Sequence, residues 1–147
     1  MTEIDGHFNM PDKVGYTCRL LRKAVSRHGA RLVVVADRAT LDAVDQSLWT
    51  MAPTEFVAHC RIGDEPYVVR RSPVVLAEEG SQLPLPVLPI LVNLGAEVPA
   101  GFERFERLID IVSEGEADRR SGRVRWAHYK AGGFAIRHHR YGEGAAG

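Results

Sequence analysis

Residues 32–41 read Leu-Val-Val-Val-Ala-Asp-Arg-Ala-Thr-Leu, and this stretch decides the fold class. The run Leu32–Ala36 is apolar without alternation, which is typical of a strand covered on both faces. Asp37 can cap a following helix, whose apolar residues repeat at helical spacing as far as Trp49. A second helical pattern precedes the strand and stops at Gly29. Helix, buried strand and helix in this order predict a layered α/β domain.

The rest of the chain continues the same pattern less regularly. Strands are expected near residues 4–8, 74–77, 90–94, 108–112 and 134–139, and the longest helix over residues 114–131. Segments 56–62 and 66–71 are expected to be strand or extended loop, while the pattern of residues 63–72 has no explanation. We predict one domain over residues 1–141 and a disordered tail over residues 142–147.

Charge is distributed unevenly along the chain. The 147 residues include 19 Lys and Arg and 19 Asp and Glu, and this neutrality argues against a general nucleic-acid coat protein. Residues 119–140 nevertheless hold seven basic residues and no acidic one, so twelve basic and nineteen acidic residues remain elsewhere. The neutral chain therefore has one positive end.

Most signatures of catalysis and of cofactor binding are absent. No glycine-rich phosphate loop follows the strand at residues 32–36, no His and Cys spacing suits a zinc site, and no nucleophile elbow is present. We therefore predict a protein without catalytic residues, cofactor or metal. The chain begins without a secretory leader, and Cys18 and Cys60 stand in apolar surroundings, which favours reduced cysteines and a cytoplasmic location. No apolar run approaches the ~18 residues of a membrane span.

The helix predicted over residues 114–131 carries the most informative pattern. Arg119, Arg123, Trp126 and Lys130 are spaced to share one helix face, and a strand ending in Val112 precedes them. Cations around an indole suit an acidic peptide with an aromatic side chain, because arginine binds a carboxylate bidentately. Two other interpretations remain open, a solvated basic face and a site for single-stranded nucleic acid. The opposite face is expected to pack on the core through four residues: Ala117, Val124, Ala127 and Ala131.

A second candidate surface follows the helix that ends near Trp49. Trp49, Pro53 and Phe56 cluster there, either folding back on the core or forming anchors for a partner protein.

Four stretches together resemble a known family. They are residues 41–49 (Leu-Asp-Ala-Val-Asp-Gln-Ser-Leu-Trp), 56–59 (Phe-Val-Ala-His), 104–110 (Arg-Phe-Glu-Arg-Leu-Ile-Asp) and 123–134 (Arg-Val-Arg-Trp-Ala-His-Tyr-Lys-Ala-Gly-Gly-Phe). In order and spacing they are similar to the chi subunit family of the bacterial DNA polymerase III holoenzyme, a clamp-loader accessory subunit. One departure is Gly122 inside the helix, which costs ~1 kcal/mol relative to Ala.

The resemblance implies a three-layer α/β fold, Rossmann-like without a nucleotide-binding loop, and a non-catalytic adaptor. It implies a pocket for the acidic, Phe-terminated tail of single-stranded DNA-binding protein, with Arg123 on the terminal carboxylate, Val112 and Trp126 on the ring, and Arg119 on the upstream acids. It further implies that Trp49 and Phe56 face the psi subunit or another clamp-loader component, or else a repair helicase. DNA would be contacted mainly indirectly, at replication forks on the nucleoid.

Overall fold

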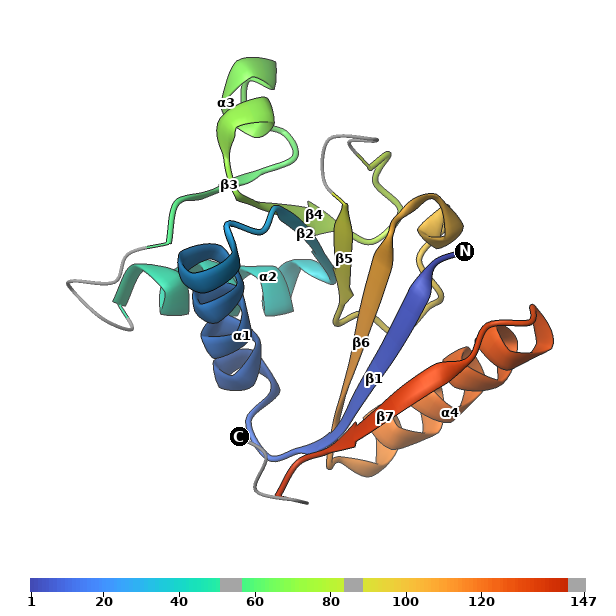
Figure 1. Cartoon of the computed structure of the whole chain (residues 1–147). Helices are drawn as coiled ribbons and strands as arrows, with labels where there is room; N and C mark the ends of the chain where they lie inside the picture. Colours follow the sequence, from blue (N-terminus) through green and yellow to red (C-terminus); the bar gives the residue numbers. More distant parts are fainter. Residues whose placement is uncertain (51–56, 84–88, 143–147) are drawn as a thin grey trace.

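The computed structural model describes residues 1–50, 57–83 and 89–142, and within them the chain forms one seven-stranded sheet with helices against it (Figure 1). The strand order is β3-β4-β2-β5-β6-β1-β7, and every paired strand runs parallel to its neighbour. The predicted α/β class is thus confirmed. The elements in chain order are β1 (Glu3–Met10), α1 (Lys13–His28), β2 (Leu32–Ala36), α2 (Arg38–Thr50), β3 (His59–Arg61), α3 (Pro66–Arg71), β4 (Val74–Glu78), β5 (Ile90–Asn93), a 3₁₀ turn (Phe102–Arg104), β6 (Arg107–Ser113), α4 (Glu116–Ala131) and β7 (Ile136–Arg140).

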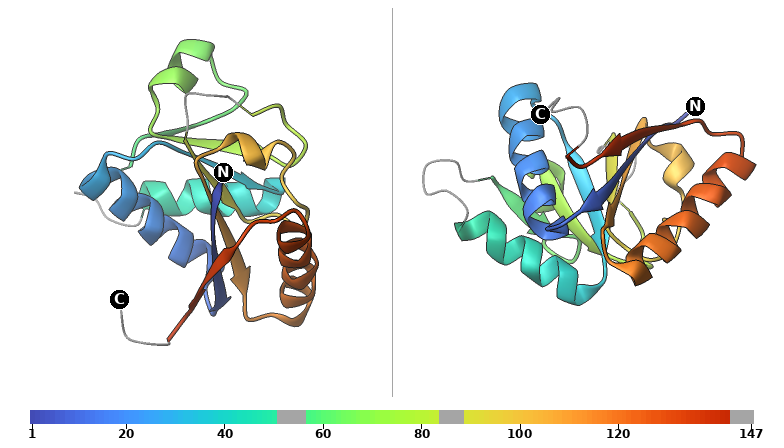
Figure 2. Two further views of the ribbon diagram at one scale, coloured as in Figure 1. Left: turned by 45° about the vertical axis from the view of Figure 1, so that its right-hand side comes forward. Right: turned by 90° about the horizontal axis from the view of Figure 1, so that it is seen from below.

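Helices cover both faces of the sheet, which makes three layers. Helices α1 and α2 pack on one face and α4 on the other, as the view from below shows (Figure 2). The β2 strand lies between β4 and β5, and all five of its residues are buried. Its alternate side chains enter the two cores, Val34 beneath α1 and α2 and Val33 on the opposite face. This double burial is why Leu32–Ala36 shows no alternation of apolar and polar residues.

The first helix begins and ends where local chemistry dictates. The Asp12 carboxylate accepts a hydrogen bond from the Gly15 backbone N–H and caps α1. Gly29 then adopts a left-handed conformation with φ of 58° and ends the helix. A residue with a Cβ atom adopts this conformation less readily than glycine.

None of the helices in the described ranges is long and apolar enough to cross a membrane.

The segment Pro66–Arg71 corrects one prediction, because it forms the short helix α3 and not an extended segment. Pro66 occupies the first turn of α3, where its missing N–H removes no helical bond. The neighbouring Val68 and Val69 had favoured a strand through their branched side chains. The unexplained residues 63–72 therefore form a turn followed by this helix. Of the predicted segment 56–62, residues 59–61 form β3, whereas Phe56 lies outside the described residues.

The amino-terminal strand β1 is the last but one strand at the β7 end of the sheet. The β1 strand pairs with β6 on one side and β7 on the other. Its register with β6 shifts between His7 and Met10, where Asn9 adopts a positive φ of 65°. Such an irregularity bends a strand and redirects its side chains. Because β1, β6 and β7 run parallel, their carboxyl ends lie together at one end of the sheet, beside the start of α4 (Figure 1).

Candidate functional site

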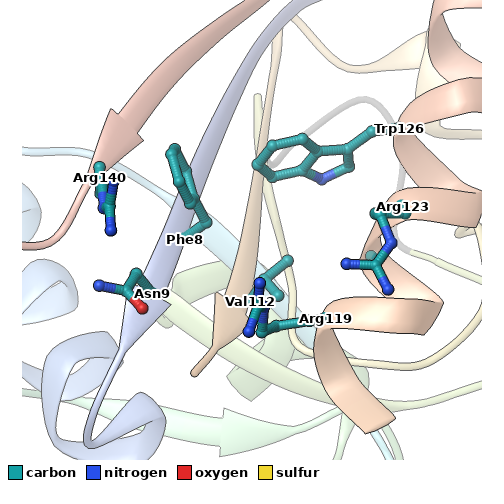
Figure 3. A pocket seen from close by; sticks show the side chains of 8 residues that line it. Phe8, Asn9, Val112, Arg119, Arg123, Trp126 and Arg140 are labelled. Atoms are coloured by element: carbon teal, nitrogen blue, oxygen red, sulfur yellow. The ribbon is translucent and has the colours of Figure 1, made fainter. Parts of the chain in front are cut away.

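A pocket of about 340 Å³ opens where the strand ends meet α4. Three strands and one helix contribute to it, and Figure 3 shows the cations arranged around the aromatic and aliphatic side chains. Parallel α/β proteins commonly bind ligands outside the carboxyl ends of their strands, so the position suits a binding site. The lining residues are Phe8 and Asn9 of β1, Val112 of β6, Arg119, Gly122, Arg123 and Trp126 of α4, and Arg140 of β7.

Two glycines make room for the pocket's apolar wall. A Cβ at Gly122 would lie 2.8 Å from a Val112 methyl carbon, and a Cβ at Gly6 would lie 2.6 Å from the Trp126 ring. Neither approach is compatible with a side chain unless its neighbour moves. The unfavourable glycine inside α4 thus has a structural reason, because it lets the helix lie directly on Val112.

The inner face of α4 differs from the prediction. Ala117, Val124, Ala127 and Ala131 are all exposed, and Val124 keeps 68% of its surface accessible. The residues buried against the sheet are instead Gly122, Arg125 and Tyr129. The predicted apolar stripe was wrong because helix orientation here follows a buried polar network and not side-chain hydrophobicity.

That network is centred on Asp110 in the middle of β6. Arg125 donates two hydrogen bonds to its carboxylate, from Nε at 3.0 Å and from Nη2 at 2.8 Å, and both side chains are fully buried. Tyr129 donates a third from its hydroxyl at 2.7 Å. Burial works against the Arg125 charge, but Asp110 outweighs it and holds the Arg125 pKa above its ordinary value. Burial and the adjacent Asp110 carboxylate also raise the pKa of Tyr129, so the hydroxyl remains a donor.

Several of the seven basic residues between positions 119 and 140 form ion pairs with acidic side chains. Arg125 is neutralised by Asp110, Arg137 lies 2.8 Å from Asp5, and Arg120 lies 3.6 Å from Glu116. Among the described residues, no acidic side chain forms an ion pair with the three arginines that line the pocket: Arg119, Arg123 and Arg140. Of the four cations of residues 119–140 that have no acidic partner among the described residues, three line the pocket and the fourth is Lys130.

Aromatic rings form the other part of the site. Trp126 meets Phe8 edge to face with ring centroids 5.7 Å apart, and His138 of β7 lies 5.3 Å from the indole. The indole Nε1 is buried, and none of the described residues accepts its hydrogen. Figure 3 shows this nitrogen on the ring edge toward Val112 and Arg123. An unsatisfied buried donor costs about 1–3 kcal/mol.

The structure brings together four of the five residues predicted for this site. Val112, Arg119, Arg123 and Trp126 all line the pocket, whereas Lys130 is exposed farther along α4 and is not in the lining. Sequence reasoning missed Phe8, Asn9 and Arg140, which come from strands far away in the chain. The pattern Ile4, Gly6, Phe8 on one face of β1 was a usable signal, because a glycine within a strand marks a close approach by another group.

The polar groups on the other face of β1 and β7 form a cluster of their own. Burial and the charge of His139 lower the pKa of His7 to about 4, against the opposing effect of Asp5. Burial raises the pKa of Asp5, but the hydrogen bonds from Arg137 and His139 and the charges of Arg137 and Arg107 together outweigh it, so the pKa is lowered. Across the described part of the chain, no three His, Cys, Asp or Glu side chains lie together as metal ligands.

The second predicted surface is only half described. Trp49, at the end of α2, keeps 62% of its surface exposed, while Phe56 lies outside the described residues. The Trp49 ring lies edge to face with His59, at a centroid distance of 5.4 Å. His59 Nε2 lies 2.7 Å from Asp45, and its Nδ1 lies 2.8 Å from the Val57 carbonyl oxygen. The exposed tryptophan therefore rests against a histidine held from both ring nitrogens.

Fold and pocket together define a class, an α/β protein with a pocket lined by arginines and by apolar and aromatic side chains at the carboxyl ends of its strands. The sequence matches the family described as DNA polymerase III chi subunit, HolC, over residues 1–137. The chain therefore belongs to the chi subunit family and is an accessory subunit of DNA polymerase III. No curated protein matches the sequence.

Proposed function

We propose that this subunit is a non-catalytic adaptor that binds the acidic carboxyl-terminal tail of single-stranded DNA-binding protein and connects it to the clamp loader. One observation carries the proposal: three arginines without described acidic partners surround an apolar wall made by Val112, Phe8 and Trp126. A tail that ends in Phe offers a ring for this wall and carboxylates for the cations. Membership of the chi subunit family agrees with such a role.

Each group has a distinct part in this proposal. Arg123 takes the terminal carboxylate, because it lies beside both Trp126 and the Val112 wall (Figure 3). Val112 and Trp126 hold the phenylalanine ring, and Arg119, one turn before Arg123, attracts the acidic residues upstream. Phe8 and Arg140 extend the same surface toward β7. The exposed Lys130 adds positive charge at longer range.

A titration of a synthetic tail peptide tests the pocket. The protein would carry Trp49→Phe, so that fluorescence reports on Trp126 alone. Arg123→Ala should weaken binding about tenfold or more, and added salt should weaken it in the parent. Arg120→Ala is the matched control, because Arg120 lies on the same helix but outside the pocket and beside Glu116. Equal binding by Arg123→Ala and the parent would reject the pocket.

The same titration separates peptide binding from direct binding of nucleic acid. Capture of single-stranded DNA through phosphate contacts would show a steep dependence on salt and no dependence on a terminal Phe. Neutralisation of Arg125 and Arg137 within the fold leaves fewer cations for a phosphate backbone. We therefore expect weak binding of oligonucleotides and strong discrimination between peptides that end in Phe and those that end in Ala.

The clamp-loader contact is proposed at the end of α2. Trp49 is a large exposed anchor whose ring is already positioned by His59, and anchors of this kind dominate protein interfaces. This end of α2 lies on the side of the molecule away from α4 (Figures 1 and 2), so we expect that two partners can bind together. The partner would be the psi subunit, another clamp-loader component or a repair helicase. Trp49→Ala should abolish recovery of clamp-loader subunits from cell extract, whereas Tyr67→Ala on α3 should not.

A further inference from the structure

The outer edge of β7 is open next to the pocket. This strand ends the sheet, and no other strand of the described ranges pairs with its outer side. Tyr141 N–H donates to the Phe8 carbonyl oxygen at 2.9 Å, which fixes the direction of the backbone groups. In a parallel ladder alternate residues point their N–H and C=O the same way. Arg137 and His139 therefore face β1, while Ile136, His138 and Arg140 direct theirs outward.

The residues with outward backbone groups also direct their side chains toward the pocket side of the sheet. Ile136 packs in the core beneath α4, the His138 ring lies against Trp126, and Arg140 lines the pocket. Figure 3 places Arg140 beyond Phe8, on the side of the pocket away from α4. The free edge and the pocket are therefore one continuous surface, with Arg140 belonging to both.

The charge of this edge restricts what can pair with it. Residues 136–140 read Ile-Arg-His-His-Arg, with no acidic residue. Arg137 is paired with Asp5 of β1, so the cation of this edge without an acidic partner among the described residues is Arg140. Charged side chains on an edge strand discourage pairing with like-charged or apolar strands of other molecules. Arg140 favours an acidic strand, because opposite charges on neighbouring strands attract.

We infer that the acidic segment farther upstream, beyond the residues next to Arg119, adds to the outer edge of β7 as an eighth strand. This rests on the proposed function, since the pocket must hold the peptide's carboxyl end. The pocket lies at the carboxyl end of β7, so the segment enters from the Ile136 end and runs parallel to β7. The edge spans about 13 Å from Ile136 to Arg140, which an extended segment of about five residues covers. Main-chain bonds thus add affinity that does not depend on which acidic residue stands at each position.

Backbone-modified peptides test the added strand directly on the unaltered protein. The probes are synthetic acidic peptides ending in Phe: a short one that fills only the pocket, and one extended by about five acidic residues. In the long peptide, N-methyl groups would be placed at alternate amides, or at the amides in between. One set should weaken binding about fivefold for each lost hydrogen bond, and the other should leave it unchanged. Equal affinity for both sets would overturn the added strand.

Amide hydrogen exchange gives a second readout. The long peptide should slow exchange at His138 and Arg140, whose N–H groups point outward, more than the short peptide does. Arg137 and His139 serve as internal controls, because their N–H groups already face β1. Slowing at all four amides to the same degree would indicate general stabilisation and would contradict the proposal.

A protein variant complements the peptides. His138→Pro removes an outward N–H without removing a bond to β1, and proline is tolerated on edge strands. His138→Ala removes the ring alone and is the matched comparison. His138→Pro should bind the long peptide about fivefold more weakly than His138→Ala, and the two should bind the short peptide alike. No binding of the short peptide to the unaltered protein would reject the pocket itself, whereas its binding without these differences would reject only the edge.

Discussion

The two faces of the sheet are held together by different physics. The core beneath α1 and α2 consists of apolar side chains such as Leu21, Val34 and Leu48. The opposite face has an apolar core too, but Asp110, Arg125 and Tyr129 are buried within it. Apolar packing tolerates small shifts, whereas a bidentate ion pair has one geometry. The helix that supplies half of the pocket's lining residues is therefore the one whose rotation on the sheet is fixed by directional bonds.

The largest effect is expected from removing the buried ion pair on the α4 face of the sheet. Asp110→Ala leaves the Arg125 guanidinium buried without its counter-charge and should lower the free energy of unfolding by about 3–5 kcal/mol, measured in urea. The double variant Asp110→Leu with Arg125→Met removes both charges and should recover most of this loss. In this double variant no ion pair fixes the rotation of α4 on the sheet, so the tail peptide should still bind more weakly than it binds the parent. Full recovery of both stability and binding would show that the ion pair has no positioning role.

A large-to-small substitution in the core beneath α1 and α2 should lower the free energy of unfolding without changing peptide affinity. Leu21 is fully buried in α1, so Leu21→Ala should cost about 3 kcal/mol of unfolding free energy through lost burial and a cavity. Peptide affinity, measured well below the melting temperature, should not change, because Leu21 lies on the face opposite the pocket. Weaker binding by this variant would mean that the two faces are coupled and would break the comparison.

The smallest effect on stability is expected at Gly122. Gly122→Ala gains about 1 kcal/mol of helix propensity but pushes its new Cβ against Val112, so unfolding free energy should change by less than about 1 kcal/mol. Displacement of Val112 should nevertheless narrow the pocket and weaken peptide binding several-fold. Adding Val112→Ala removes the clash, and a double-mutant cycle should show coupling between the two sites. Additive effects on binding would contradict a direct contact.

The sequence predicted the apolar face better than the polar one, for a physical reason. Continuous burial of Leu32–Ala36 and the stripe in α2 depend on side-chain hydrophobicity, which a single chain displays. Burial of Arg125 depends on Asp110 standing opposite it, and nothing in the spacing of one helix reveals a counter-charge on a neighbouring strand. Helical spacing still found Arg119, Arg123 and Trp126, because these share a face of one element. Arg140 and Phe8 join them only through pairing of β1 with β7, which is not a local property.

The central position of β1 in its half of the sheet also has a consequence for biosynthesis. Its partners β6 and β7 are separated from it by most of the chain, so Phe8 meets Arg140 only after the residues between them have been translated. At elongation rates of about 5–20 residues per second this takes roughly seven to twenty-six seconds, and β1 lacks β6 for most of that time and β7 until its end. A nascent or prematurely terminated polypeptide that ends before β7 would lack one wall of the pocket. Such a fragment could not compete with the finished subunit for its ligand.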